Sequence, residues 1–200
     1  MIKQQFLGRN PSHFQVNPLV KSFIISEAFL WSAWNFITPI FAIFIANKIT
    51  GGNVSIAASA YSVFLIARII FELISSKYYS KSSDNKKLKV TVYGIMLLSI
   101  AYFGFALSKT VFPIFLFYIF AGAGFGISAP LKNSLFSTHL DKDKEPIEWS
   151  LHDTVVFIGM ALSTALGGFI ASIYGFSVLF ILAAIVNILS TIPYILLVRK

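Results

Sequence analysis

The chain has 200 residues, of which 56% are hydrophobic and 12% are charged, and it contains no cysteine. Soluble domains are about 45–50% apolar and about 25% charged, so this composition excludes an ordinary soluble domain, and the lack of cysteine excludes a disulfide-stabilised secreted scaffold. The formal net charge of +8 comes from basic residues between long apolar runs. Such a distribution is typical of charges that flank membrane spans, not of a nucleic-acid-binding surface.

Six apolar segments are each long enough to cross the hydrocarbon core, which takes about 20 residues of helix. The predicted spans cover roughly residues 20–46, 54–76, 88–108, 112–135, 149–172 and 175–197. A polar N-terminal arm of residues 1–19 precedes a single transmembrane domain of residues 20–200. Backbone groups in lipid must bond internally, and these runs lack the alternation of barrel strands. We therefore predict an all-α polytopic membrane protein, a bundle of six transmembrane helices.

The basic residues predict the orientation of this bundle. Twelve of the 16 Lys and Arg residues lie in, or within two residues of, the N-terminal arm, the second and fourth loops and the C-terminus. The loops on the opposite side contain only Lys48 and Lys109. Because cytoplasmic loops carry the excess of Lys and Arg, both termini are expected in the cytoplasm, with the protein in the cell (plasma) membrane.

Several ionisable residues lie inside the spans, where charges are costly and commonly functional. They are Glu27 in the first span, Arg68 and Glu72 in the second, Lys132 in the fourth, and His152 and Asp153 early in the fifth. At about 1.5 Å per residue, Glu27 and Arg68 lie at matching depths of about 10 and 12 Å from the cytoplasmic ends of their helices. We therefore expect these ionisable residues to form a buried or water-lined charge network between the first, second, fourth and fifth spans, in which Glu27 pairs with Arg68. Arg68 and Glu72, spaced i, i+4, are expected on one helix face. The alternative is a purely structural ion pair, or side chains that extend to the interface.

The first span also carries a polar and aromatic stripe at helical spacing. It comprises Glu27, Trp31, Trp34, Asn35 and Thr38. The stripe either lines a cavity that contacts a ligand or packs neighbouring helices. The residues we select as coupling or cavity candidates are Glu27, Trp31, Asn35, Arg68 and Glu72, and the candidates for a cytoplasmic gate are Lys81, Lys132 and Asp153.

Small residues indicate where helices approach closely. The fourth span contains the G-x-x-x-G pair of Gly122 and Gly126, and the fifth contains Gly159, Gly167 and Gly168. Small residues let helix backbones come together in membranes. We therefore expect tight packing between the fourth and fifth spans, or of either span against a partner.

No motif supports catalysis or cofactor binding. The three histidines, His13, His139 and His152, lack metal-ligand spacing, and no hydrolase, zinc-protease or nucleotide-binding sequence occurs. The titratable residues around the fourth loop are better explained by a solvated loop than by an intramembrane hydrolase. We expect no enzyme activity, no cofactor, no metal and no nucleic-acid partner.

The fourth span is rich in glycine and ends in Pro130, and Leu166-Gly-Gly-Phe169 and Tyr174-Gly-Phe176 precede a last apolar run. With six spans, both termini inside and a basic second loop, these features resemble one half of the fold of the major facilitator superfamily. The second-loop signature of that family is matched at its start by residues 68–76. It departs from the signature where Ile74 replaces a proline, Ser76 a glycine and Ser80 an aspartate. In the family, that aspartate is part of a gating latch on the cytoplasmic side.

The resemblance implies one half of a twelve-helix transporter that moves a small solute by alternating access, with the solute site between two six-helix halves. The second half would come from a homodimer or from another chain. With both termini on one side, two identical chains are related by a two-fold axis along the membrane normal, as the two halves of the full fold are. In this interpretation Glu27 and Arg68 serve ion or proton coupling or recognise charge on the solute. The alternative is a non-transporting membrane scaffold or assembly partner, which the altered second-loop signature favours.

Overall fold

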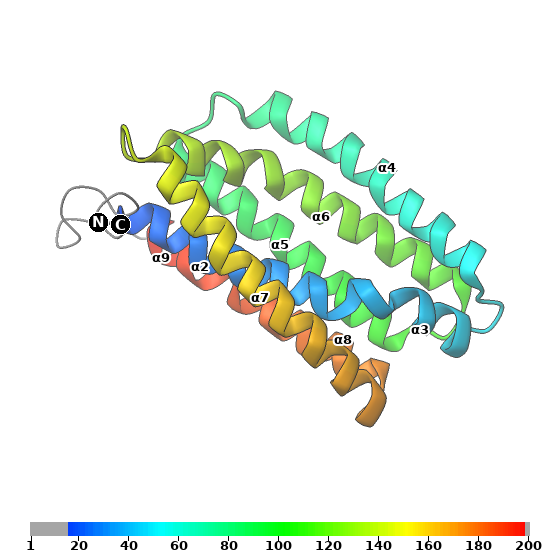
Figure 1. Cartoon of the computed structure of the whole chain (residues 1–200). Coiled ribbons are helices and arrows are strands. Elements are labelled where there is room, and N and C mark those ends of the chain that lie inside the picture. Colours follow the sequence, from blue (N-terminus) through cyan, green and yellow to red (C-terminus); the bar gives the residue numbers. More distant parts are fainter. Residues whose placement is uncertain (1–15, 199–200) are drawn as a thin grey trace.

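A computed structural model describes residues 16–198 of the chain and confirms the all-α, six-span prediction (Figure 1). The first span is built from α2 (Pro18–Ile37), the 3₁₀ turn η2 (Thr38–Ile40) and α3 (Phe41–Lys48). The next four spans are α4 (Val54–Tyr79), α5 (Asp84–Leu107), α6 (Val111–Thr138) and α7 (Glu145–Ile173), and the last comprises α8 (Phe176–Leu189) and α9 (Thr191–Val198). Most of the predicted arm, residues 1–15, lies outside the described residues, and α2 already begins at Pro18.

Polar side chains and one glycine determine where several helices begin. The Asn17 side chain accepts a hydrogen bond from the Leu19 backbone N–H at 2.9 Å, and Asn53 does the same for Ile56 at 2.9 Å. Each satisfies an N–H group that has no partner inside its helix. Gly175 has a φ of 85°, a left-handed conformation open to glycine, and makes the tight turn between α7 and α8.

Two spans are interrupted near prolines. In the first span, Pro39 lies within η2, where α-helical geometry gives way to a 3₁₀ turn. In the last span, the helix is broken at Ser190 and resumes at Thr191, two residues before Pro193. Proline lacks a backbone N–H and its ring clashes with the preceding turn, so continuous helices are disfavoured at both points. The sixth span was predicted as one helix over residues 175–197, so this break was not foreseen.

The helices form two layers. In the first layer α4 packs on α6 and α7 packs on α2, while α6 and α2 meet through long side chains. The second layer consists of α5, α8 and α9. Within it α5 packs on α8 and α9, and against the first layer α5 packs on α6 while α8 and α9 pack on α2. Figure 1 shows α4 and α7 on different sides of the bundle. The order of the first layer is therefore α4, α6, α2, α7.

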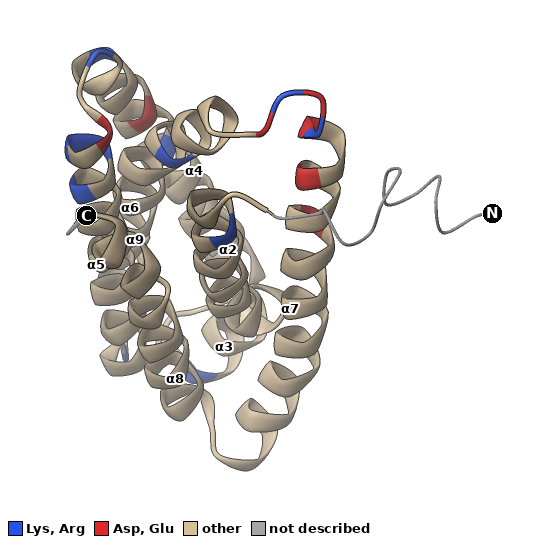
Figure 2. Cartoon of the chain, turned by 90° about the vertical axis from the view of Figure 1, so that its left-hand side faces the viewer, with Lys and Arg blue, Asp and Glu red and all other residues tan. Residues whose placement is uncertain are grey.

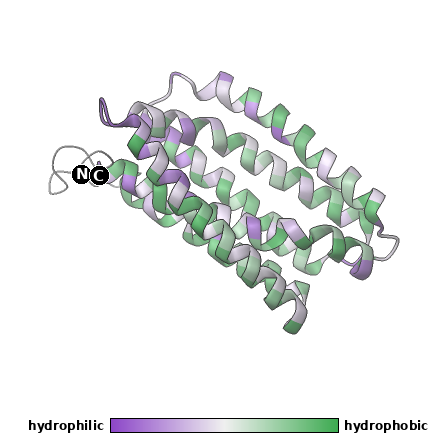
Figure 3. Ribbon diagram, viewed as in Figure 1, coloured by the Kyte–Doolittle hydropathy of each residue, from purple (hydrophilic) through white to green (hydrophobic). Residues whose placement is uncertain are grey.

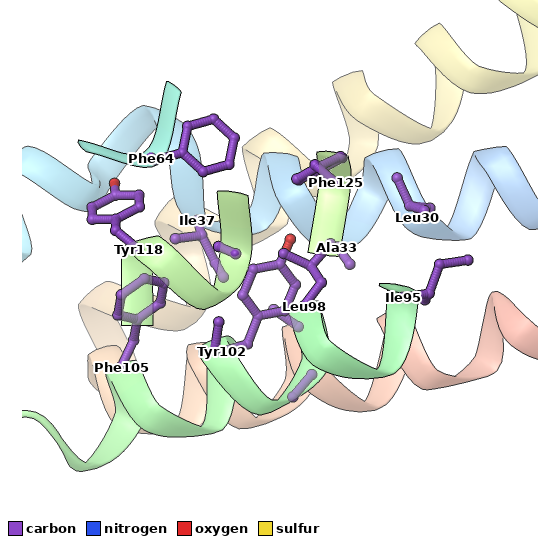
Figure 4. Close-up of a cluster of buried hydrophobic side chains, with 14 of the residues drawn as sticks. Leu30, Ala33, Ile37, Phe64, Ile95, Leu98, Tyr102, Phe105, Tyr118 and Phe125 are labelled. Carbon is purple, nitrogen blue, oxygen red and sulfur yellow. The ribbon is translucent and has the colours of Figure 1, made fainter. Parts of the chain in front are cut away.

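An apolar core fills the space between the layers (Figure 4). Leu30, Ala33 and Ile37 of α2 face Leu98 and Tyr102 of α5, and all five are buried. Many large apolar side chains are also exposed on the outside of the bundle, for example Ile66 and Ile158, and the hydropathy colouring shows that apolar residues predominate along the helices (Figure 3). An apolar core combined with an apolar outer surface is expected for a protein whose solvent is lipid.

Charged residues gather at one end of the bundle (Figure 2). This is the end where α2 begins and α9 ends, and it also holds the loops 80–83 and 139–144; it is called the terminal end below. The opposite end holds the loops 49–53, 108–110 and 174–175.

The expectation that spans four and five pack tightly on each other is wrong. Gly126 of α6 approaches α4, because a Cβ there would lie 2.5 Å from the Arg68 carbonyl oxygen, and Gly122 approaches the same helix. Gly159 and Gly167 of α7 instead approach α2, at Ser32 and Phe36. The glycines of α6 and those of α7 thus allow close approach to different helices. The helices α6 and α7 meet near their connecting loop, where Phe136 packs on Trp149. Gly168 contacts no other segment: nothing lies within 4 Å of the position of its Cβ.

A matched pair of glycine substitutions tests this packing. A Cβ on Gly124 of α6 would lie 2.6 Å from the Gly94 carbonyl oxygen of α5, so we expect Gly124→Ala to force the two helices apart. The expected loss is about 1–3 kcal/mol of unfolding free energy. Gly168→Ala meets nothing and removes a helix-weakening glycine, so it should leave stability unchanged or raised by up to about 1 kcal/mol. Thermal unfolding of both variants in detergent measures the difference, and equal melting temperatures would contradict the close approach of α5 and α6.

Candidate functional site

A buried ion pair joins the two central helices of the first layer. The Lys132 Nζ of α6 lies 2.5 Å from Glu27 Oε2 of α2, and the two side chains are only 4% and 6% exposed. The expected Glu27–Arg68 pair is therefore wrong. Arg68 lies on α4, which packs on the far side of α6, so α6 and not α4 presents its basic residue to Glu27.

Two further donors hold the Glu27 carboxylate. The Trp31 indole N–H donates to Oε2 at 3.1 Å, and the Tyr194 hydroxyl donates to Oε1 at 3.3 Å. Lys132 also lies 5.9 Å from the centre of the Trp31 ring, which is a cation–π distance. A buried charge persists only when it is paired and hydrogen-bonded, and both conditions are met here.

Sequence reasoning missed Tyr194. It follows Pro193 in the last span and is fully buried beside Glu27. A phenol inside an apolar span was the signal that could have found it. Its position on α9, after the break at Ser190, brings the last span into the site.

A second charge pair lies on α4. Arg68 Nε is 3.5 Å from Glu72 Oε2, as the i, i+4 spacing predicts, and these side chains are 33% and 41% exposed. The Arg68 guanidinium lies 5.4 Å from the centre of the Phe125 ring, and Phe125 packs on Trp31 at 5.9 Å between ring centres. Phe125 therefore connects the exposed pair on α4 with the buried pair between α2 and α6.

The rest of the stripe on the first span bonds to its own helix. The Asn35 amide donates to the Trp31 carbonyl at 2.9 Å, and the Thr38 hydroxyl donates to the Trp34 carbonyl at 2.8 Å. Trp34 stacks on Phe64 and meets other rings of the aromatic cluster. Of the stripe, the structure thus brings Glu27 and Trp31 directly into the ion-pair site.

The three gate candidates do not come together. Lys81 is exposed in the loop 80–83, and Asp153 is exposed on α7 beside His152, at 3.0 Å between Oδ1 and the ring Nδ1. Lys132 is instead buried in the pair with Glu27. Among residues 16–198, no three His, Asp or Glu side chains form a group that could hold a metal ion.

A small cavity adjoins the ion pair. Its volume is about 20 Å³, and it is lined by Glu27 and Lys132 together with His152 and Asn133, and by the rings of Phe23, Phe136 and Trp149. A cavity of about 10–15 Å³ is enough for one water molecule when polar groups surround it. The buried pair and a titratable side chain of α7 therefore share one water-sized space.

The fold and the sequence agree with one known group of membrane proteins. The structure is similar to that of PepTSo, a POT family transporter, solved in meso, with a TM-score of 0.73 and 14% sequence identity. The likeness covers 89% of this chain but 37% of the transporter's chain, so this chain spans well under half of that protein's length. No curated protein matches the chain in sequence. The sequence profile of the Major Facilitator Superfamily matches residues 23–200, all six spans included. By this match the chain belongs to the major facilitator superfamily.

Proposed function

We propose that this chain is one six-helix half of a membrane transporter that moves a small solute by alternating access, and that a second copy of the chain supplies the other half. The family profile across residues 23–200 is the observation that carries the proposal. Positive charge concentrated at the terminal end supports an orientation with both termini in the cytoplasm, and we propose the plasma membrane as the location.

The distribution of buried residues supports a two-fold assembly. In the most apolar windows of α4 and α7, 22% and 17% of the residues are buried, compared with 50% in α5 and α6. The two helices lie at the two edges of the first layer and leave apolar side chains uncovered, for example Ile66 on α4 and Ile158 on α7. A two-fold axis along the membrane normal, beside this layer, would place α4 of one copy against α7 of the other. The apolar side chains at both edges of the layer would then be covered.

Glu27 is the proposed coupling group. Carboxyl groups inside membrane spans are the side chains that commonly carry protons in pumps and transporters. Protonation of Glu27 would also release Lys132, which holds α6 to α2 in the structure. One proton would thus loosen a contact between the two central helices, the kind of change that alternating access needs.

Uptake by proteoliposomes tests the proposal. We would measure accumulation of labelled glucose, alanine, dialanine and lactate with and without an inward proton gradient. The expected result is gradient-driven uptake of at least one of them, about tenfold weaker in Glu27→Gln. Glu27→Gln leaves Lys132 as a buried charge without a partner. The double variant Glu27→Gln/Lys132→Met removes both charges and serves as a second test protein in the same assay.

Glu145→Gln is the matched control, because it removes an exposed carboxylate at the start of α7 and should keep the gradient dependence. An unaltered gradient dependence in both Glu27 variants would exclude Glu27 as the coupling acid. Dimeric protein that accumulates none of the solutes would favour the non-transporting scaffold instead.

A further inference from the structure

We propose that His152 relays protons between the aqueous phase at the terminal end and Glu27, through the water-sized cavity that the two residues share. This inference rests on the proposed role of Glu27 as the coupling acid. It adds the route by which a proton reaches a carboxylate that is almost fully buried.

Geometry limits the possible routes to Glu27. Both carboxylate oxygens already accept bonds, from Lys132 and Trp31 on one oxygen and Tyr194 on the other. Neither the Trp31 indole nor Lys132 while charged is a proton acceptor. His152 is the titratable side chain of α7 that borders the same cavity. It lies near the start of α7, at the terminal end, one helical turn after Glu148.

The surroundings of His152 suit a relay. The ring Nδ1 lies 3.0 Å from Asp153 Oδ1, and Asp153 is exposed, so the imidazole is oriented by a carboxylate at the water boundary. A hydrogen bond from Nδ1 to that carboxylate leaves Nε2 as the basic nitrogen of the neutral ring. Phe136 and Trp149 pack on the ring, with centres 5.1 and 5.6 Å away, and fix its position.

Other charged groups surround the relay from each neighbouring element. Glu148 of α7 is buried and accepts a hydrogen bond from the Asp141 backbone N–H at 2.9 Å. Lys21 of α2 borders an adjoining groove with Leu151. The charged groups that share the cavity with His152 or contact it are Glu27 of α2, Lys132 of α6 and Asp153 of α7, while Glu148 lies one helical turn before it and Lys21 borders the adjoining groove.

The proton balance is simple. A proton from solution binds Nε2 of neutral His152 and gives an imidazolium, whose charge Asp153 offsets. The imidazolium then gives that proton to a water in the cavity while the water gives one of its own to the Glu27 carboxylate. His152 returns to neutral, Glu27 becomes neutral, and Lys132 keeps its charge. One proton has moved from solution to Glu27, and no other reactant is consumed.

The tryptophans provide a readout that needs no solute. Trp31 donates to Glu27, so a chain in which Trp31 is the sole tryptophan (Trp34→Phe/Trp149→Phe) reports Glu27 protonation by fluorescence. We would place the full chain in lipid nanodiscs and release protons with a laser flash from a caged acid. We expect His152→Ala to slow the Trp31 response about tenfold or more, and free imidazole to restore the rate. A role limited to packing would not be rescued by imidazole.

His139→Ala is the control, because His139 lies at the same end but faces Asp84, at 3.3 Å. It should leave the rate unchanged. A Trp31 signal that titrates with pH but keeps its rate in His152→Ala would overturn the relay alone, with the proposed role of Glu27 intact. A Trp31 signal that does not respond to pH at all would overturn both. Glu27→Gln must abolish the response for the signal to be assigned to Glu27.

Discussion

Lys132→Met should destabilise the bundle by about 3–5 kcal/mol, since it leaves the Glu27 carboxylate charged and buried without its cationic partner. Glu27→Gln should cost less, because the amide oxygen can still accept from Trp31 while the amide NH2 donates to the Tyr194 hydroxyl, and the remaining ammonium retains its contact with the Trp31 ring. Combining the two substitutions removes both charges. We expect the double variant to recover most of the loss, to within about 1 kcal/mol of the parent protein.

Chemical unfolding in mixed micelles, followed by circular dichroism, measures these differences. The control cycle is Arg68→Met with Glu72→Gln, the partly exposed i, i+4 pair on α4, where each change should cost less than Lys132→Met because neither charge is fully buried. Equal losses in the two cycles would mean that Glu27 and Lys132 do not interact as a buried pair. A coupling free energy between Glu27 and Arg68, in place of one between Glu27 and Lys132, would instead support the pair that was expected from the depth of the residues in the membrane.

The sequence predicts the spans well because their signal is local. Length and hydropathy suffice to find six helices, and the Arg68–Glu72 contact follows from i, i+4 spacing within one helix. The fold class and the family resemblance rest on the same kind of information. Each of these predictions is confirmed without knowing which helix neighbours which.

The partner of Glu27 could not be predicted in the same way. Position along a span gives the depth of a residue in the membrane, and Glu27 and Arg68 do share a depth, but depth does not give the order of helices around the bundle. That order depends on contacts such as Gly126 against the α4 backbone, which places α6 between α4 and α2. The charge on Lys132 was thus assigned to a gate near the interface, whereas the structure buries it.

Tyr194 was missed, and His152 was found as an ionisable residue of the fifth span but not placed beside Glu27, for a related reason. Neither lies on a helix that the stripe of the first span identifies as a neighbour, and each reaches Glu27 only through tertiary packing. The break at Ser190 was also not predicted, although Ser190, Thr191 and Pro193 mark it in the sequence. Sites assembled from four spans are visible in sequence only as isolated polar residues.

Cross-linking between two copies tests the central claim that a second six-helix unit packs on the edges formed by α4 and α7. The chain contains no cysteine, so single substitutions label it uniquely. Ile66 on α4 and Ile158 on α7 are both exposed, and each lies about 20 Å along its helix from the terminal end. Ile185 of α8 lies at the same depth and is exposed on the second layer, which makes it the matched control.

Two differently tagged chains would be reconstituted together in lipid, one with Ile66→Cys and the other with Ile158→Cys, and treated with a short bismaleimide. The expected result is a covalent species of two 22.2 kDa chains carrying both tags, with at least tenfold less product when Ile185→Cys replaces Ile66→Cys. No linked species above the control, at a protein density where chance encounters are rare, would contradict the two-fold assembly on which the proposed transport depends.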